Sequence, residues 1–165
     1  MTYRVSSQYL GLQPIASTST VQNHPVGTIV RAVDETYGEG EFIYLKGVAS
    51  TAVGSVVTYN LSTHATALAA VGTNKAQPIA IAMSANVASQ WGWYQISGIA
   101  VVAKTCTVSL AANAAVGVLT VGLIAGTGSG KEVSGALVAV VASATAGRTT
   151  VQVVLNRPRM QGRVS

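Results

Sequence analysis

The chain has 165 residues, of which 49% are hydrophobic and only 9% are charged, and its formal net charge at pH 7 is +5. The length fits one domain with a single core, and Ser, Thr, Asn and Gly interrupt every apolar run before the roughly 20 residues that a transmembrane helix needs. Because an ordinary soluble domain carries about 25% charged residues, this composition favours a protein that covers much of its surface with neighbours, and it favours assembly over catalysis.

The N-terminal residues 1–26 are polar, rich in Ser and Thr, and interrupted by two prolines, with no helical or alternating period. We therefore predict an extended arm that is disordered alone and orders on a partner, because it buries too little to offset the entropy of ordering. Tyr3, Arg4 and Tyr9 are its candidate partner contacts. The segment lacks the apolar stretch and cleavage site of a secretory signal, which predicts folding in the cytoplasm.

From residue 27 onward, short runs rich in Val, Ile, Thr and aromatic residues are bounded by Gly, Asn, Ser or Pro. The runs predicted as strands are 28–33, 41–48, 55–60, 78–84, 91–103, 106–110, 117–124, 135–143 and 149–156. The turn signals between them recur at about 8–12 residues, a spacing typical of sandwiches and barrels.

The predicted fold class is therefore all-β: a β-sandwich or barrel, jelly-roll-like, of about nine short strands with an extended N-terminal arm. The arm covers residues 1–26, the β domain residues 27–158, and a basic C-terminal tail residues 159–165.

Two short matches suggest an internal repeat. The triplet at 52–54 recurs at 115–117, and the pair at 84–85 recurs at 143–144, about sixty residues further on. A duplicated β unit would produce such matches, and so would chance in a chain this rich in Ala, Val and Gly.

Four of the five acidic residues lie close together: Asp34, Glu35, Glu39 and Glu41. Their spacing does not fit an EF-hand loop, and no substrate cleft accompanies them to suggest a glycosidase. Two interpretations remain. The segment is a solvated β-turn, or it is an acidic contact for basic residues of a neighbouring subunit.

The C-terminal end carries Arg157, Arg159 and Arg163 around Pro158. Proline cannot donate to a ladder, so we expect Pro158 to end the last strand. The arginines that follow either reach a partner's carboxylates or stay solvated.

Trp91, Trp93 and Tyr94 concentrate the large aromatic side chains in one predicted strand. At a period of two, Trp91 and Trp93 share one sheet face and Tyr94 points to the other. We expect at least one tryptophan in the core, while the other face is a ligand platform or a subunit contact.

No pattern in the sequence indicates catalysis, a metal or a cofactor. Cys106 is the only cysteine, which excludes an intrachain disulfide and a cysteine-based zinc site. The segment 125–132, AGTGSGKE, lacks the first glycine and the final hydroxyl of a phosphate-binding loop. His24 and His64 have no acidic or cysteine neighbour in sequence. We therefore predict no enzyme activity, no cofactor and no metal site, and the scattered basic residues argue against direct nucleic-acid binding.

Taken together, segments 27–50, 54–60, 78–102 and 151–158 resemble the decoration, or cement, proteins of tailed-bacteriophage capsids. The resemblance spans residues 25–158 and is one of overall style, without a catalytic fingerprint. It implies a non-enzymatic head-stabilisation protein, made in the host cytoplasm and located on the capsid exterior. Such a protein binds the lattice as a homodimer or homotrimer and bridges neighbouring major capsid proteins, without contact to a membrane.

Under that resemblance, the arm would lie along a capsid subunit or a sister subunit, and the acidic turn and terminal arginines would add charge complementarity. An alternative is a host-binding, carbohydrate-binding module of a tail fibre or baseplate, with Trp91, Trp93 or Tyr94 as the sugar platform. A third hypothesis is a hydrolase whose site includes His24 or His64.

Overall fold

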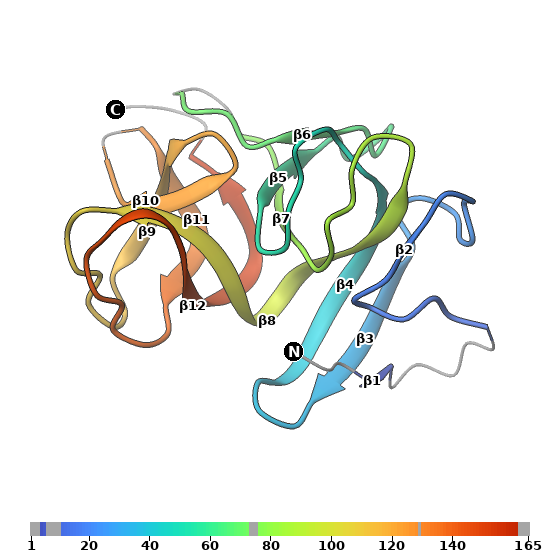
Figure 1. Ribbon diagram of the computed structural model, residues 1–165, viewed down its shortest axis with the longest axis horizontal. Coiled ribbons are helices and arrows are strands. Elements are labelled where there is room, and N and C mark those ends of the chain that lie inside the picture. The colour runs from blue at the N-terminus through green and yellow to red at the C-terminus, as the bar shows by residue number, and fades with distance from the viewer. Residues whose placement is uncertain (1–3, 6–10, 73–75, 129, 162–165) are drawn as a thin grey trace.

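The computed structural model describes residues 4–5, 11–72, 76–128 and 130–161, and Figure 1 shows these residues as strands and connecting segments. The fold is all-β, with a closed barrel and further strands outside it, which confirms the predicted fold class. The described residues contain no helix long and apolar enough to cross a membrane.

The strands are β1 (Arg4–Val5), β2 (Thr18–Ser19), β3 (Ile29–Asp34), β4 (Gly38–Lys46), β5 (Val56–Tyr59), β6 (Thr66–Leu68), β7 (Ile79–Ala82), β8 (Trp91–Cys106), β9 (Ala115–Thr120), β10 (Leu123–Gly126), β11 (Glu132–Val138) and β12 (Thr145–Met160).

Three predicted strands differ clearly from the structure. The predicted strand 135–143 extends too far, because β11 ends at Val138. The predicted strand 106–110 is wrong, because β8 ends at Cys106 and only Leu110 makes an isolated bridge beyond it, to Ala142. The predicted strand 117–124 is two strands, since the chain turns at Gly122, whose φ of +69° suits a residue without a Cβ.

The barrel is the ring β8–β10–β9–β11–β12, which closes because β12 also pairs with β8. All neighbours are antiparallel except β10 and β8, which meet in parallel at Ile124 and Lys104. Every second residue points inward, so Val102, Val118 and Val153 pack in the barrel core. Closure pairs these strands over most of their length and so removes most of the free sheet edge that an open sheet would expose.

The other half of the molecule is built on the first part of β8, which pairs with β4 on one side and β7 on the other. In Figure 1, β8 runs from these strands into the barrel. Its direction changes near Gly98, where φ is +91° and the pairing with β4 shifts register. A Cβ on Gly98 would lie 2.5 Å from the carbonyl oxygen of Glu39, so this bend requires glycine.

The strand order repeats within the chain. β6–β5–β7–β8 are neighbours in one half, and β10–β9–β11–β12 are neighbours in the same order in the other. The turns before β5 and β9 also match, since Gly54 and Asn113 both have positive φ. The Gly54 N–H donates to the Ala82 carbonyl at 2.8 Å, and the Asn113 N–H donates to the Val138 carbonyl at 2.8 Å.

This structural correspondence sets the register of the repeat. It aligns residues 52–56 with 111–115, whereas the triplet 115–117 matched in sequence lies inside β9. A duplication of one β unit stays a prediction, and the recurring strand order supports it.

Most of the described N-terminal segment lies on the chain's own body. β2 pairs with β8 at Gly92 and Trp91, and Ile15 is only 3% exposed. Ile15 packs with Phe42, Trp93 and others in a separate core cluster. Residues 11–25 have little regular structure, as an arm would, but they cover part of the β domain.

The prediction that Pro158 ends the last strand is wrong. β12 continues to Met160, and its pairing with β11 resumes at Arg159 after a register shift. Arg157 has a φ of +43° and Gly135 opposite has a φ of +78°, so the chain accommodates Pro158 in a bulge.

Candidate functional site

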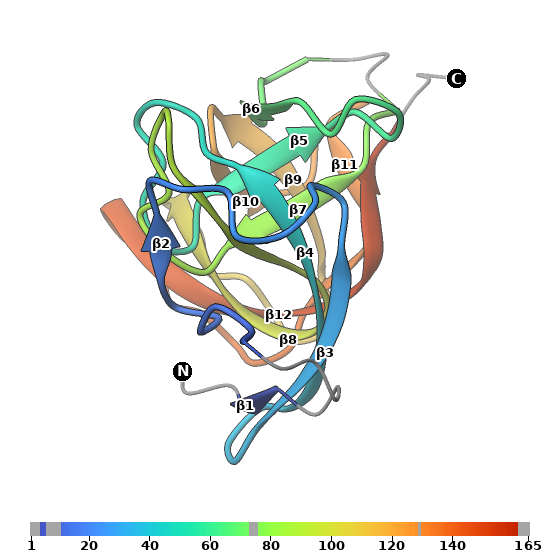
Figure 2. The same ribbon diagram turned by 90° about the vertical axis from the view of Figure 1, so that its right-hand side faces the viewer.

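The acidic segment forms the tip of the β3–β4 hairpin, which projects beyond the other strands in Figure 2. Asp34 is 5% exposed, and its Oδ1 accepts hydrogen bonds from the N–H groups of Thr36 at 2.8 Å and Tyr37 at 3.0 Å. This arrangement stabilises the turn, and it leaves Asp34 buried in the structure.

The other three acids of the hairpin pair with arginines of the same chain. Glu35 lies 3.1 Å from Arg4, and Glu39 lies 3.9 Å from Arg31. Glu41 carries two pairs, with the closest atoms 3.4 Å from Arg31 and 3.0 Å from Arg157.

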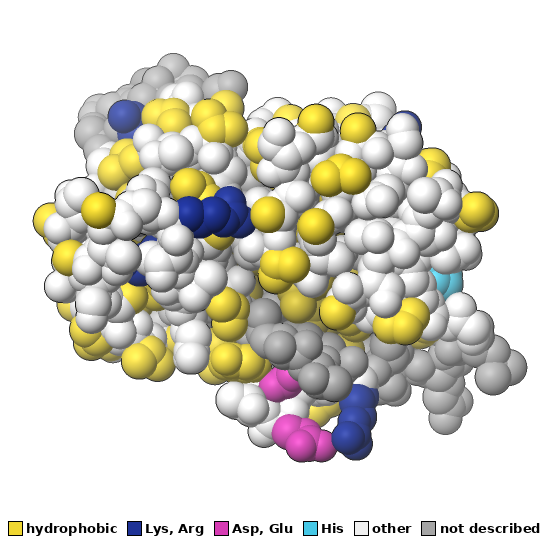
Figure 3. Space-filling model, in the orientation of Figure 1, with side chains coloured by type: hydrophobic (Ala, Val, Ile, Leu, Met, Phe, Trp, Pro, Cys, Tyr) yellow, Lys and Arg dark blue, Asp and Glu magenta, His cyan; other side chains and the backbone are white. Residues whose placement is uncertain are grey.

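The Glu41–Arg157 pair brings the acidic turn and one of the C-terminal arginines together within one molecule. Under the capsid resemblance, both groups were expected to contact neighbouring subunits, with solvent exposure as the alternative for each, and that role stays a prediction. The arginines concerned are more than half exposed, so each pair contributes little to stability. In Figure 3 the acids and an adjacent basic side chain gather at one edge of a face that is otherwise mostly apolar or uncharged.

Of the other candidate partner contacts predicted in the two terminal segments, the structure describes Arg159. Arg159 is exposed on β12, where it pairs with Ser134 of β11. Tyr3, Tyr9 and Arg163 lie outside the described residues.

Of the three clustered aromatic residues, only Trp91 is partly exposed. Trp93 and Tyr94 are fully buried, in two different core clusters on opposite faces of β8. This confirms the predicted alternation and the core position of one tryptophan. The Lys46 ammonium lies 5.6 Å from the centre of the Trp91 ring, so Trp91 already has a cationic neighbour.

Gln13 organises the contact between the N-terminal segment and the β domain, a role that sequence analysis missed. Its carbonyl accepts the Trp93 indole N–H at 2.9 Å, and its Oε1 accepts from the Tyr44 hydroxyl at 3.1 Å and from Asn23 Nδ2 at 2.9 Å. Its own Nε2 donates to Ser17 O at 2.7 Å. Burial raises the pKa of the Tyr44 hydroxyl, and a hydrogen bond from the Asn23 N–H opposes that rise.

The two histidines have structural contacts. The His24 ring packs edge-on against Tyr44 with centroids 5.1 Å apart, and its Nε2 accepts the Gln13 N–H. His64 packs against Gly27, where an added Cβ would lie 2.4 Å from the His64 Nε2. Cys106 is buried, and the described part of the chain shows no cluster of three or more His, Cys, Asp or Glu that could hold a metal ion.

An exposed apolar face lies on the outside of the barrel. Val154 of β12 pairs with Ile99 of β8 on one side and with Leu137 of β11 on the other, so the three side chains form a row across the sheet. Leu137 is 45% exposed and Val154 is 44% exposed. Val140 and Val141, in the segment that follows β11, are more exposed still. We call these five residues the apolar face.

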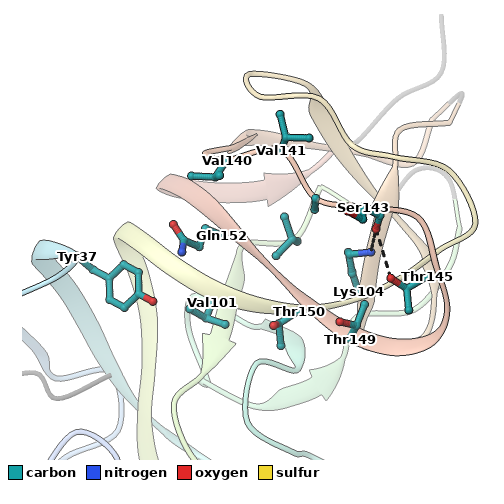
Figure 4. Close-up of a pocket in the computed structure, with 12 residues that line it drawn as sticks. Tyr37, Val101, Lys104, Val140, Val141, Ser143, Thr145, Thr149, Thr150 and Gln152 are labelled. Carbon is teal, nitrogen blue, oxygen red and sulfur yellow. Dashed lines mark hydrogen bonds between the residues drawn. The ribbon is translucent and has the colours of Figure 1, made fainter.

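A groove of about 370 Å³ borders this face, and Figure 4 shows it extending from Tyr37 at one end to Lys104, Ser143 and Thr145 at the other. It lies between the segment after β11 and the middle of β12. The described residues that line it are mostly β-branched or polar, and none is acidic. Lys104, in the wall, is only 1% exposed and donates a hydrogen bond to the Ser143 carbonyl at 2.8 Å.

Comparisons of the chain with protein-family models, with curated proteins and with solved structures find no match. The surface itself is therefore the basis for inferring a function.

Sequence analysis did not find the apolar face or the groove. Alternation along 149–156 contained part of the signal, because Val151, Val153 and Leu155 point inward while Val154 points outward. In a continuous apolar run, the sequence does not distinguish a strand that is buried on both faces from one that exposes a valine on one face.

Proposed function

We propose that this chain is a structural virion protein that binds the outer surface of a phage capsid and stabilises the lattice by bridging major capsid proteins. The observation that carries the proposal is the apolar face, where Ile99, Val154 and Leu137 lie in a row on the closed barrel. An exposed row of large apolar side chains on a sheet is typical of a surface that another protein covers.

The low charge supports the same function. Nine per cent charged residues is far below the usual share, and most of the acids of the hairpin pair within the chain. A surface of this kind loses little hydration free energy when a neighbour covers it. Protein partners, namely the major capsid protein and further copies of this chain in a dimer or trimer, fit it better than nucleic acid does.

Stabilisation would follow from mass action over many equivalent sites. A protein that binds the assembled lattice and not its dissociated subunits shifts the equilibrium toward the lattice. Each contact can be weak, because an oligomer that holds several subunits at once gains from effective concentration.

The carbohydrate-binding alternative loses most of its platform in this structure. Trp93 and Tyr94 are buried, and Trp91 is only partly exposed beside Lys46. The proposal also assigns the lattice contact to the apolar face in place of residues 11–25, because that segment is bound to the chain's own core.

Co-sedimentation with empty shells of the major capsid protein from the same phage tests the proposal. We expect the full chain to pellet with the shells and to raise their melting temperature. Leu137→Asp should weaken binding by on the order of tenfold or more, because it places a charge in the covered face. Leu61→Asp is the matched control, since Leu61 is 64% exposed on a different part of the molecule. A full chain that stays in the supernatant would overturn the proposal.

A further inference from the structure

The groove beside the apolar face contains an unpaired stretch of sheet edge. The ladder between β11 and β12 ends at Val138 and Val153, and one further hydrogen bond joins the Ala139 N–H to the Gln152 carbonyl at 2.8 Å. Beyond that point the segment after β11 leaves β12, and its Ala142 pairs with Leu110 instead. Among the described residues, β12 then has a ladder partner only on its β8 side.

Along β12, the backbone N–H and C=O groups of successive residues point alternately toward the β11 side and toward β8. Gln152 directs its carbonyl toward the β11 side, so Thr150, two residues away, directs its N–H and C=O to the same side. Thr149 and Val151 are the residues whose backbone groups face β8, opposite Lys104 and Val102. Thr150 therefore presents one backbone donor and one acceptor to the groove.

Lys104 supplies the groove with a positive charge that has no acid beside it. Its side chain starts on the inner face of the barrel, opposite Thr149, and its Nζ reaches the Ser143 carbonyl at the end of the groove, as Figure 4 shows. An ammonium has three N–H donors, and no described carboxylate lies within 4.0 Å of it. A buried cation with one neutral acceptor gains from an incoming anion.

We propose that the groove binds an extended, acidic segment of a partner protein, which adds as a strand to the β12 edge at Thr150 and places a carboxylate on Lys104. Val140, Val141 and Tyr37 on the groove wall take the apolar side chains of that segment. Main-chain hydrogen bonds give such a complex its affinity, and the charge and the apolar wall give it specificity. This inference deepens the proposed function, because it states the chemistry by which a lattice protein would be recognised.

The charges of the chain itself argue for a partner that is a different protein. Asp34 is buried in the hairpin turn, and Glu35, Glu39 and Glu41 pair with arginines. Of the five acidic side chains, only Glu132 remains, and it lies within β11. A second copy therefore offers little acidic chain to the groove.

Titration of the isotope-labelled full chain with a blocked peptide, acetyl-Thr-Val-Glu-Val-Thr-amide, tests the inference without any capsid. We expect amide shifts at Val101, at 140–145 and at 149–152, and slower exchange of the Thr150 N–H. The peptide with Gln in place of Glu should bind on the order of tenfold more weakly. Equal binding of the two peptides, or shifts elsewhere in the chain, would overturn the inference.

Two variants test the two contacts separately. Lys104→Met keeps most of the side-chain volume and removes the charge, so it should abolish the preference for Glu; Lys46→Met, which changes an exposed lysine outside the groove, should keep it. Thr150→Pro removes the backbone donor on the groove side and leaves the hydrogen bonds to β8, so it should weaken both peptides. If Lys104→Met does not fold, the comparison of the two peptides on the unchanged chain still decides.

These experiments distinguish failure of the groove inference from failure of the proposed capsid function. If the chain binds capsid shells but Lys104→Met binds them equally well, the groove inference fails and the capsid function stands. If the chain ignores the shells but prefers the acidic peptide, the capsid function fails and the groove remains an acidic-peptide site. Self-association that Thr150→Pro abolishes would assign the groove to a second copy and overturn the inference.

Discussion

Replacing Ile15 with Ala tests whether the N-terminal segment is part of the core. Ile15 is 3% exposed and packs with Val30, Phe42 and Trp93, three residues held in regular strands. Those neighbours cannot move far into the space that the deleted atoms leave, so the loss includes a cavity as well as the lost burial. We expect the free energy of unfolding to fall by about 3 kcal/mol, within the range of about 2–5 kcal/mol known for such truncations.

For a chain of this size, about 3 kcal/mol corresponds to a fall in Tm of roughly 6–12 °C. Thermal and urea unfolding, followed by circular dichroism and by tryptophan fluorescence, measure the change. Val21→Ala is the matched control, because Val21 lies in the same segment but is 66% exposed, and it should change stability by less than about 0.5 kcal/mol. Equal Tm values for the two variants would refute the view that this segment belongs to the core.

Three further predictions concern the bend, the buried tyrosine and the hairpin. Gly98→Ala should destabilise the chain by more than about 1 kcal/mol, and by more than Gly147→Ala does, because both glycines have a φ of +91° but only Gly98 would bring its Cβ within 4 Å of other atoms. Burial raises the pKa of the Tyr94 hydroxyl above its usual value, so the unfolded state loses this proton at a lower pH than the folded state does. The urea midpoint should therefore decrease as the pH rises past about 10, and Tyr94→Phe should flatten that decrease. A double-mutant cycle on Glu41 and Arg157, by urea unfolding, should give a coupling of about 0.2–1 kcal/mol that shrinks at high salt.

The sequence contained enough to predict the all-β class, because strand composition and turn spacing are local signals. It did not contain the closure of the barrel. Closure depends on β8 and β12, which are each 16 residues long and change partners along their length. A period-two pattern predicts which residues alternate, but it does not say how many neighbours a strand has.

The recurring strand order also shows, at single residues, what the sequence alone does not contain. Gly54 and Asn113 occupy equivalent turns with positive φ, and both residue types tolerate that conformation. The strand order thus pairs 52–54 with 111–113, whereas the identical letters at 115–117 lie inside β9, because the backbone conformation recurs at this turn and the residue type does not. Gln13 was missed for a related reason, because its partners at Tyr44 and Trp93 are distant in sequence.

The pairing of charges within the chain changes which force should hold it on a partner. The sequence hypothesis placed residues 1–26 along a partner subunit, with the acidic turn and the C-terminal arginines adding charge complementarity, and that charged part of the contact would depend on salt. In the structure Glu41 and Arg157 contact each other, and the candidate contact surface is the apolar face with the adjoining groove, whose lining holds Lys104 and no acidic residue. Burial of apolar area is not weakened by salt, so occupancy on capsid shells should fall only slightly between low and high ionic strength. A steep loss of occupancy at high salt would favour the charged hairpin and tail as the contact, and would rule out the apolar face as the main one.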